Sequence, residues 1–421
     1  MTFLKTDMSK KQALFTFLLI LFIALPSPVW SQLILGQYED EAPFRTWNTV
    51  GILNGTSLAL GGAHFSVQSD CSVSFTNPAL LSELPGFSFA INTSLDSASF
   101  FKYSIVNTGV LSTEENPTQG ILALDYAGAA YNYKGWAFSI NLGLIENYDR
   151  PPVKSKYAYE GTLYYTLDFQ QEGFLKNINL SFAGRPHKKI AVGIGLNFVS
   201  GHLKKSIEED FVQSNITILD RKTHEYKGFY INGGALLHLS SRVSAGIMFR
   251  TPYSKKAESE SLQQYVSPGG DTDIKIEASA ENSYEQPLIM GLGFAYRFSE
   301  HFTAVSDLTY FRWSSYSITY FDEDLKRNFR DVLKVGAGIE YITSIKVFNQ
   351  SIPVPLRTGI CFDPQPMKDP ASRYLSFSFG TGIRWKRFFL DIGALFGSER
   401  GSGDNLSGQR FTVTLGYKGN Q

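Results

Sequence analysis

Segments in which bulky apolar residues alternate with small or polar ones recur along most of the chain. In residues 190–198, Ile, Val, Ile, Leu and Phe alternate with Ala, Gly, Gly and Asn. Residues 288–296 and 333–341 follow the same scheme. A period of two is that of a β-strand, whose successive side chains point to opposite faces. The pattern therefore predicts an all-β protein.

The pattern predicts fourteen strands, at 86–95, 120–132, 135–147, 175–185, 188–203, 226–239, 242–254, 285–298, 302–320, 329–342, 353–363, 373–385, 388–398 and 408–418. An even number lets the first strand pair with the last in a closed barrel. Every second connection is short, except 343–352, whereas 96–119, 148–174, 204–225 and 255–284 are long and polar. Residues 161–171 also alternate, and we assign them to a hairpin within one long loop.

One face of these strands is bulky and apolar, whereas the other carries mainly Gly, Ala, Ser and Asn. A soluble sandwich also alternates, but its outer face usually carries many long charged side chains. The small second face suits a crowded lumen, so we predict a transmembrane antiparallel β-barrel of about 14 strands. The short turns predict the periplasmic rim and the long loops the extracellular rim.

The first residues have the layout of a secretory signal peptide. Three lysines precede the apolar run 13–25, and prolines and a small residue follow it. We predict a signal peptide over 1–31, cleaved before Gln32; the alternative is an uncleaved membrane anchor, for which the apolar run is short. A formal net charge of zero gives no electrostatic reason to expect a nucleic-acid partner.

The segment 55–81 is too rich in Gly, Ser and Ala for an ordinary core element, and too apolar for a linker. We interpret it as part of a hatch over 32–85 that plugs the lumen of a barrel over 86–421. Gly61 and Gly62 would let its backbone bend or approach the wall closely. Asn77-Pro78-Ala79 predicts a fixed turn that braces the hatch, or a turn with no part in transport.

Three stretches resemble the FadL-type outer-membrane transporters of long-chain fatty acids and other hydrophobic compounds. GTSLALGGA followed by SDCSVSFTNPALL, which contains Asp70, resembles the family's hatch. SDLTYFRWSSY (306–316) resembles a strand with a Trp-Ser pair, and LRTGICFD (356–363) one with Arg-Thr-Gly before an acidic residue. The chain departs from the pattern at its end, where a short tail follows Tyr417. PorV-type secretion barrels carry a similar hatch.

The resemblance implies a monomeric protein of the Gram-negative outer membrane, without catalytic residues, metal or other cofactor. It implies passive diffusion of long-chain fatty acids or similar hydrophobic compounds, gated by the hatch, with lateral exit beside the third strand. Gly143 in that strand could mark the wall opening, or could simply make room for the plug. The alternative function is that of a PorV-like secretion barrel that binds protein partners.

Apolar ligands need apolar pockets with a few polar groups. The candidates in the hatch, each of which could instead be packing, are Leu58, Leu60, His64, Phe65 and Phe75. Arg357 and Arg384 share the lumen-facing parity and could bind a ligand carboxylate, or could be engaged in ion pairs within the barrel. Cys71 and Cys361 could form a bridge between hatch and wall, or remain two buried thiols.

Overall fold

The computed structural model describes residues 50–98, 110–115, 121–159, 162–267, 274–326, 328–347, 350–369, 371–401 and 407–419. The predicted signal peptide (1–31) and the first part of the predicted hatch (32–49) lie outside these residues. Among the described residues, no helix is long and apolar enough to cross a membrane.

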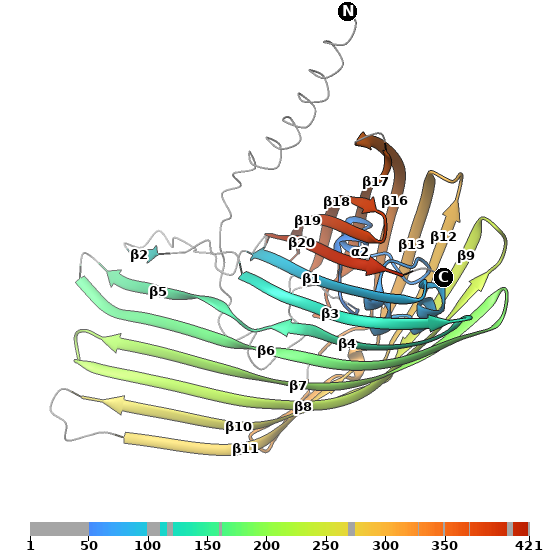
Figure 1. Ribbon diagram of the computed structural model, residues 1–421. Coiled ribbons are helices and arrows are strands. Elements are labelled where there is room, and N and C mark those ends of the chain that lie inside the picture. Colours follow the sequence, from blue (N-terminus) through green and yellow to red (C-terminus); the bar gives the residue numbers. More distant parts are fainter. Residues whose placement is uncertain are drawn as a thin grey trace, which may run out of the picture.

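All the strands belong to one sheet (Figure 1). They are β1 (Phe87–Ala98), β2 (Val110–Glu115), β3 (Ile121–Tyr133), β4 (Trp136–Asn147), β5 (Arg150–Tyr159), β6 (Thr162–His187), β7 (Ile190–Phe211), β8 (Ile216–His238), β9 (Val243–Arg250), β10 (Tyr253–Val266), β11 (Ile274–Gln286), β12 (Ile289–Arg297), β13 (Phe302–Phe311), β14 (Ser317–Tyr320), β15 (Glu323–Lys326), β16 (Val332–Val347), β17 (Gln350–Pro364), β18 (Arg373–Trp385), β19 (Phe388–Arg400) and β20 (Ser407–Lys418).

The sheet closes because β1 pairs antiparallel with β20 on one side and with β3 on the other. Thr251-Pro252 separates β9 from β10, and Pro287-Leu288 separates β11 from β12, so each pair acts as one wall strand. The prolines break the strands because they lack the backbone N–H that a ladder needs. The predicted fold, a closed antiparallel barrel of 14 strands, is confirmed.

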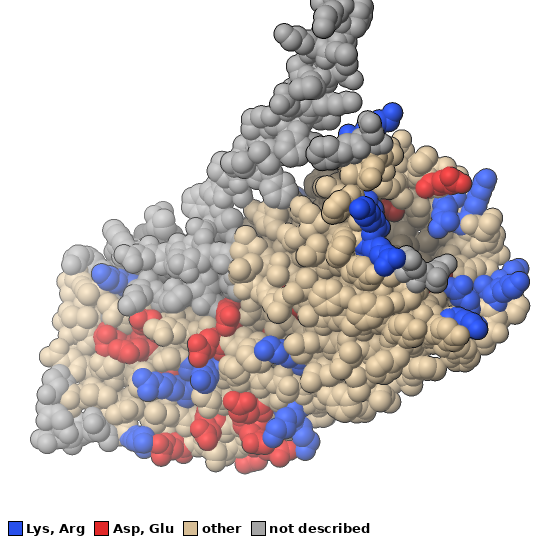
Figure 2. Space-filling model, viewed as in Figure 1, with Lys and Arg blue, Asp and Glu red and all other residues tan. Residues whose placement is uncertain are grey.

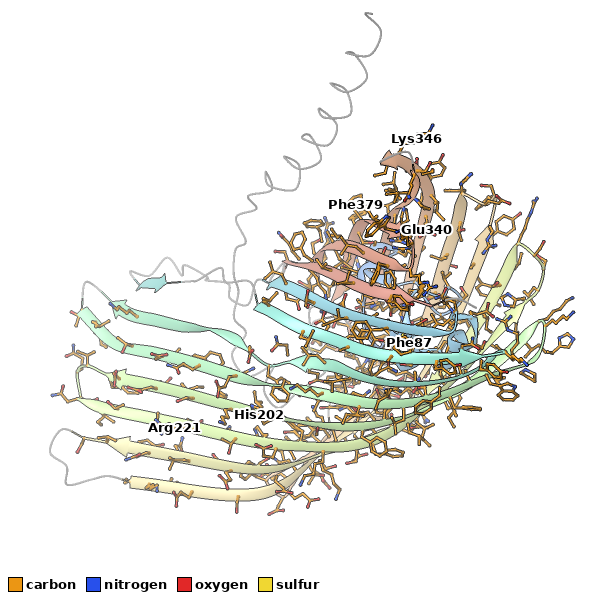
Figure 3. All side chains as sticks on the ribbon, in the orientation of Figure 1. Phe87, His202, Arg221, Glu340, Lys346 and Phe379 are labelled. Atoms are coloured by element: carbon orange, nitrogen blue, oxygen red, sulfur yellow. The ribbon has the colours of Figure 1, made fainter. Side chains whose placement is uncertain are left out.

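Residues 162–171, predicted to lie in a hairpin within a long loop, form one arm of the β5–β6 hairpin. They also continue without interruption into the wall strand that the sequence analysis began at 175, because 162–187 form one strand, β6. Its ladder with β7 runs from Tyr165↔Phe211 to His187↔Ile190, so both strands extend far past the barrel's end. The extension also includes β5, β8, β10 and β11 (Figure 1). At the opposite rim the exceptional connection 343–352 is the tip of the β16–β17 hairpin, where Lys346 lies, whereas His202 and Arg221 lie on the extension (Figure 3).

The outward face of the wall changes from apolar to polar along each long strand. On β7 the exposed apolar residues run from Ile190 to Phe198, and Ser200 and Lys204 follow with the same parity. About nine to eleven residues of a tilted strand span a bilayer, which matches this apolar stretch. Figure 2 shows charged residues toward the two ends of the molecule, with a broad uncharged band between them. This band fits the hydrocarbon core, and the extension lies outside it.

The N-terminal segment, residues 50–86, lies against the inner faces of the barrel (Figure 1). It contains the short helix α2 (Gly55–Ala59) and two 3-10 helices, η1 (Cys71–Phe75) and η2 (Pro78–Glu83). α2 packs on β17 to β20, whereas η2 packs on β3, β4, β6, β7 and β8. Nearly every side chain of these helices is buried. The predicted location of the hatch therefore agrees with the contacts of its described part.

Candidate functional site

Polar caps fix the turns of the N-terminal segment. Asn54 caps α2 by accepting from the Ser57 amide, and Asp70 caps η1 by accepting from the Ser72 amide. The Asn54 Nδ2 also donates to Asp70 Oδ2 at 2.8 Å. Asp70, predicted as a hatch residue, thus links two turns that lie 16 residues apart. Such caps satisfy the orphan amides at each helix start.

Gly61 and Gly62 adopt the left-handed backbone, with φ of +69° and +82°. The Gly61 amide donates to Ser378 Oγ on β18 at 3.0 Å. A Cβ on Gly61 would lie 2.4 Å from the Ile360 carbonyl oxygen, and one on the wall residue Gly359 would lie 2.2 Å from the Gly61 nitrogen. Glycine on both sides therefore lets the segment's backbone touch the wall's backbone.

The Asn77-Pro78-Ala79 turn is fastened to the wall through its amide side chain. The Asn77 Nδ2 donates to the Phe65 carbonyl at 2.8 Å and to the Ala235 carbonyl of β8 at 3.1 Å. Its Oδ1 accepts from the Ala79 amide, and Pro78 begins η2. The turn therefore joins two parts of the segment to β8.

Asp307 on β13 is a residue that the sequence reasoning missed. Its Oδ2 accepts from the His64 amide at 2.6 Å and from the Phe65 amide at 2.9 Å, in a buried position. Hydrogen bonds from two backbone amides to one carboxylate hold the segment strongly to the wall. Its signal was an acidic residue at a lumen-facing position of the stretch 306–316.

The candidate ligand residues of the segment are packed against protein. Leu58 clusters with Leu53 and Leu395, and Leu60 with Ala63 and Val305. Phe75 meets the Tyr126 ring at 6.0 Å between centroids. The His64 ring lies 4.9 Å from the Phe65 ring, and its Nδ1 lies 2.6 Å from the Gly62 carbonyl oxygen. These contacts match the packing alternative.

Arg357 and Arg384 are both engaged by Asp391 of β19. Arg357 lies 2.7 Å from Asp391 and 2.7 Å from Glu340, and Arg384 lies 2.9 Å from Asp391. The Arg357 side chain is only 2% exposed. These contacts match the ion-pair alternative: the arginines join wall strands β16 to β19, because a buried guanidinium needs counter-charges.

The hypothesis of a Cys71–Cys361 bridge was wrong, because both residues are free buried thiols. The Cys71 thiol donates to the Ser88 carbonyl of β1, whereas Cys361 lies on β17. β18, β19 and β20 separate these two wall strands, so the cysteines lie at different places on the inner face.

The wall is interrupted beside Gly143. The β3–β4 ladder ends at Tyr126↔Gly143, although β3 continues to Ile121 and β4 to Asn147. Among the described residues, no ladder joins these two ends, and we call this interruption the wall gap. A Cβ on Gly143 would lie 2.7 Å from the Phe75 ring, so the glycine also makes room for the N-terminal segment. Both explanations offered for Gly143 thus have a structural basis.

Aromatic side chains lie together in the lumen between the wall gap and the extension. They form one cluster with Ile145 of β4, and we call it the aromatic cluster: Tyr148, Tyr226, Tyr230, Tyr253, Tyr284, Phe311, Trp313, Tyr316 and Phe329. Because Tyr148 directly follows β4, the cluster reaches the edge of the wall gap. The sequence analysis placed most of these residues in predicted strands, and only Tyr148 and Tyr284 in long loops, but it did not predict that their side chains converge.

A buried lysine lies among these rings. Lys255 Nζ lies 4.7 Å from the Tyr226 centroid and 5.0 Å from that of Tyr284. It also lies 3.8 Å from Glu146, to which the Tyr148 hydroxyl donates. Rings stabilise an ammonium through their negative faces. The cluster therefore combines a large apolar surface with a buried lysine and its neighbouring glutamate.

Further basic groups lie on the inner face of the extension, beyond the apolar band. Lys205, Lys222 and Lys255 all act on His224, whose pKa burial and these charges lower to about 4. Burial, and then Lys222, lower the pKa of Lys205 to about 8, and Asp220 opposes this shift. His224 is therefore neutral at pH 7 and lies 2.7 Å from Ser259 Oγ. The mouth of the lumen is basic.

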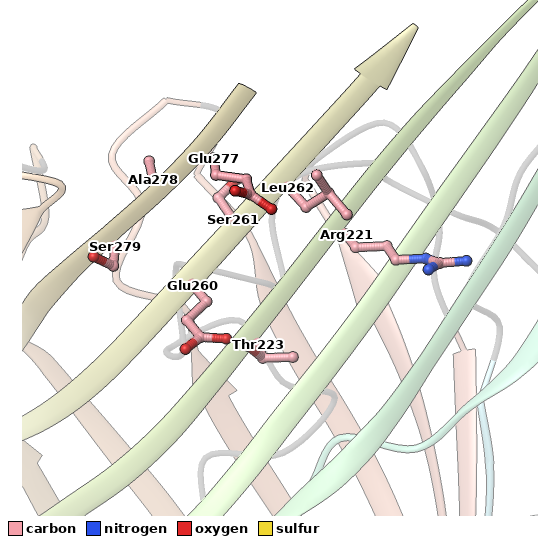
Figure 4. A pocket seen from close by; sticks show the side chains of 8 residues that line it. All are labelled: Arg221, Thr223, Glu260, Ser261, Leu262, Glu277, Ala278 and Ser279. Atoms are coloured by element: carbon pink, nitrogen blue, oxygen red, sulfur yellow. The ribbon is translucent and has the colours of Figure 1, made fainter. Parts of the chain in front are cut away.

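A pocket of about 470 Å³ lies on the extension between β8, β10 and β11 (Figure 4). It is lined by Arg221, Thr223, Glu260, Ser261, Leu262, Glu277, Ala278 and Ser279. This polar lining differs from that of the aromatic cluster and does not suit an apolar ligand.

Comparison with known proteins identifies the family. The family model "Outer membrane protein transport protein (OMPP1/FadL/TodX)" matches residues 50–375. The chain belongs to this family. Its members are outer-membrane transport proteins of hydrophobic compounds, so the predicted family and outer-membrane location are confirmed. A comparison with curated proteins finds no match.

Solved structures share the fold. The Ralstonia pickettii toluene transporter TbuX is 13% identical, with a TM-score of 0.63, over 88% of this chain and 99% of that chain. A Pseudomonas aeruginosa FadL homologue is 14% identical, with a TM-score of 0.60, over 88% and 100%. The Pseudomonas putida toluene transporter TodX is 15% identical, with a TM-score of 0.61, over 89% and 100%. At these identities the likeness concerns the fold alone.

Proposed function

We propose that this FadL/TodX-family protein carries long-chain fatty acids or similar anionic amphiphiles by passive diffusion. The ligand binds in the aromatic cluster and leaves through the wall gap into the membrane. The observation that carries this proposal is the continuity between the two, since Ile145 packs against the cluster and lies in the part of β4 that has no ladder with β3.

The charges of the lumen favour an amphiphile over a neutral hydrocarbon such as toluene, which TbuX and TodX transport according to their descriptions. Lys205, Lys222 and Lys255 converge around His224 beside the aromatic rings. A carboxylate is attracted by such a cluster, whereas toluene gains nothing from it. The acyl chain then packs against the rings, because this packing removes apolar surface from water.

Lateral exit is supported by where the wall gap lies. Beside it, the outward residues Leu122 and Leu124 of β3 are 76% and 55% exposed, as lipid-facing residues are. An acyl chain that passes there would stay in apolar surroundings throughout. A path straight through the barrel would instead cross the N-terminal segment, which is fastened by Asp307, Asn77 and the Gly61–Ser378 contact.

The N-terminal segment acts as the hatch in this proposal. Phe75 and Ile52 occupy the space into which a side chain of Gly143 would point, so a shift of η1 would change the surroundings of the wall gap directly. Such a shift would break the hydrogen bonds from Asn141 and Asn232 to Ser74, but it need not break the buried ion pairs of the wall.

The test is native mass spectrometry of the detergent-purified protein, with extraction of bound lipid and then titration with oleate or toluene. We expect a bound single-chain anionic amphiphile, and saturable binding of oleate that Lys255→Met weakens. Lys227→Met, on the exposed outer face, serves as the control. An empty lumen even in excess oleate would contradict the proposal and favour the secretion-type barrel instead.

A further inference from the structure

The β3 edge of the wall gap contains a bulge. In the β1–β3 ladder Asn92 pairs with Tyr126, whereas the next residue, Thr93, pairs with Leu124. Asp125 is therefore the extra residue, and its side chain is buried on the inner face. Bulges of this kind bend a strand and re-aim one side chain. The bulge lies one residue beyond the last β3–β4 pair.

Among the described residues, the partners of the Asp125 carboxylate lie on the side of β3 away from β4. It accepts from Asn92 Nδ2 at 2.8 Å and from Ser94 Oγ at 2.8 Å, both on β1. Arg410 Nη2 of β20 lies 3.2 Å from it and also bonds Ser94. These contacts hold residues 121–125 of β3 close to β1 and β20.

A chain of hydrogen bonds joins this carboxylate to the N-terminal segment. The Gly55 amide, at the start of α2, donates to Thr414 Oγ1 of β20 at 2.8 Å. The Thr414 hydroxyl donates to Asn92 Oδ1 at 2.6 Å, and Asn92 donates to Asp125. All four residues are buried. Buried polar chains of this kind act as units rather than as separate pairs.

An opening between two strands of a membrane barrel persists only if other contacts keep these strands apart. Facing strand edges in an apolar medium tend to pair, because an unsatisfied backbone group there is costly. We propose that Asp125 is a positioning residue that holds β3 away from β4, and that Thr414 and Asn92 couple this edge to α2. Movement of the N-terminal segment then changes the width of the wall gap. The functional meaning of this inference rests on the proposed lateral exit, but its geometry does not.

The test is disulfide formation across the wall gap. Leu124→Cys and Leu144→Cys are introduced in a background with Cys71→Ala and Cys361→Ala, and the yield is measured under mild oxidation. We expect a low disulfide yield in the protein that carries only these four substitutions. The yield should be several-fold higher after Asp125→Asn or Thr414→Val, because the released β3 can then pair with β4.

Thr412→Val is the matched control. Thr412 is buried on the same face of β20, and its hydroxyl has no hydrogen-bond partner among the described residues. Only variants that migrate as folded barrels on unheated gels are compared. The proposal would be overturned if neither Asp125→Asn nor Thr414→Val gave a higher disulfide yield than Thr412→Val. A rise for Asp125→Asn alone would overturn the coupling to α2. Neither outcome depends on transport. Failure of the proposed function would instead appear in the lipid-binding measurements described above.

Discussion

At the scale of single residues, glycine and lysine have the clearest roles. Gly61 has both a left-handed backbone and a wall carbonyl where its side chain would lie, so no other residue fits without a shift. Lys255 lies among the aromatic rings, and Lys205 lies on the inner face of the extension. The role of the glycine concerns packing, and that of the lysines, in the proposed function, concerns the ligand.

Gly359→Ala should destabilise the protein because its Cβ would lie 2.2 Å from the Gly61 nitrogen. Overpacking of this kind costs about 1–3 kcal/mol. The measurement is the thermal midpoint in detergent. Gly228→Ala is the control, since its nearest neighbour is a Tyr253 ring carbon at 3.1 Å, which can move. Equal midpoints for the two variants would contradict the close backbone contact.

Binding of an anionic amphiphile should weaken as the pH rises from 7 to 9. The pKa of Lys205 is lowered to about 8, so the lysine is mostly charged at pH 7 and loses its attraction for a carboxylate above pH 8. The loss of one such interaction corresponds to about a two- to fivefold change in Kd. Titration of oleate at several pH values measures it.

The variant Lys205→Met should bind oleate more weakly at pH 7, and its Kd should no longer rise between pH 7 and pH 9. A rise in Kd of the same size in the variant would show that another group is responsible.

At the scale of elements, the strands of the barrel were predictable and their extension was not. The alternation in 190–198 specifies a lipid-facing strand, because apolar and small residues must face lipid and lumen respectively. In 204–211 most positions on both faces are polar, so the pattern no longer marks a strand, yet the ladder with β6 continues to Phe211. The role of Asp307 was equally hidden, because its two partners lie 242 and 243 residues away.

Asp307→Ala should loosen the turn at residues 64–66 from β13. Each hydrogen bond to a charged group contributes about 1.5–3 kcal/mol, so exchange of the His64 and Phe65 amides should accelerate at least about tenfold. Hydrogen–deuterium exchange with peptide mapping measures it, and Asp307→Asn, which keeps one acceptor oxygen, should lie between. Unchanged protection in the alanine variant would show that this fastening does not hold the segment.

At the scale of the whole molecule, three features lie in sequence from the extracellular side to the membrane. The basic mouth around His224 comes first, then the aromatic cluster around Lys255, then the wall gap beside Gly143. The N-terminal segment lies beside the β4 edge of the wall gap through Phe75, and Gly55 is linked to the β3 edge through Thr414 and Asn92. In the proposed function, this arrangement gives an amphiphile a one-sided path.

The measurement that tests this path most directly is uptake of labelled oleate by cells whose wall gap is locked. In the Leu124→Cys/Leu144→Cys protein that also carries Asp125→Asn, in which we expect the disulfide to form in high yield, oxidation should abolish uptake and reduction should restore it. The control pair, Leu390→Cys/Leu415→Cys, joins residues already opposite in the β19–β20 ladder and should leave uptake unchanged. Full uptake through the locked wall gap would contradict lateral exit at this position.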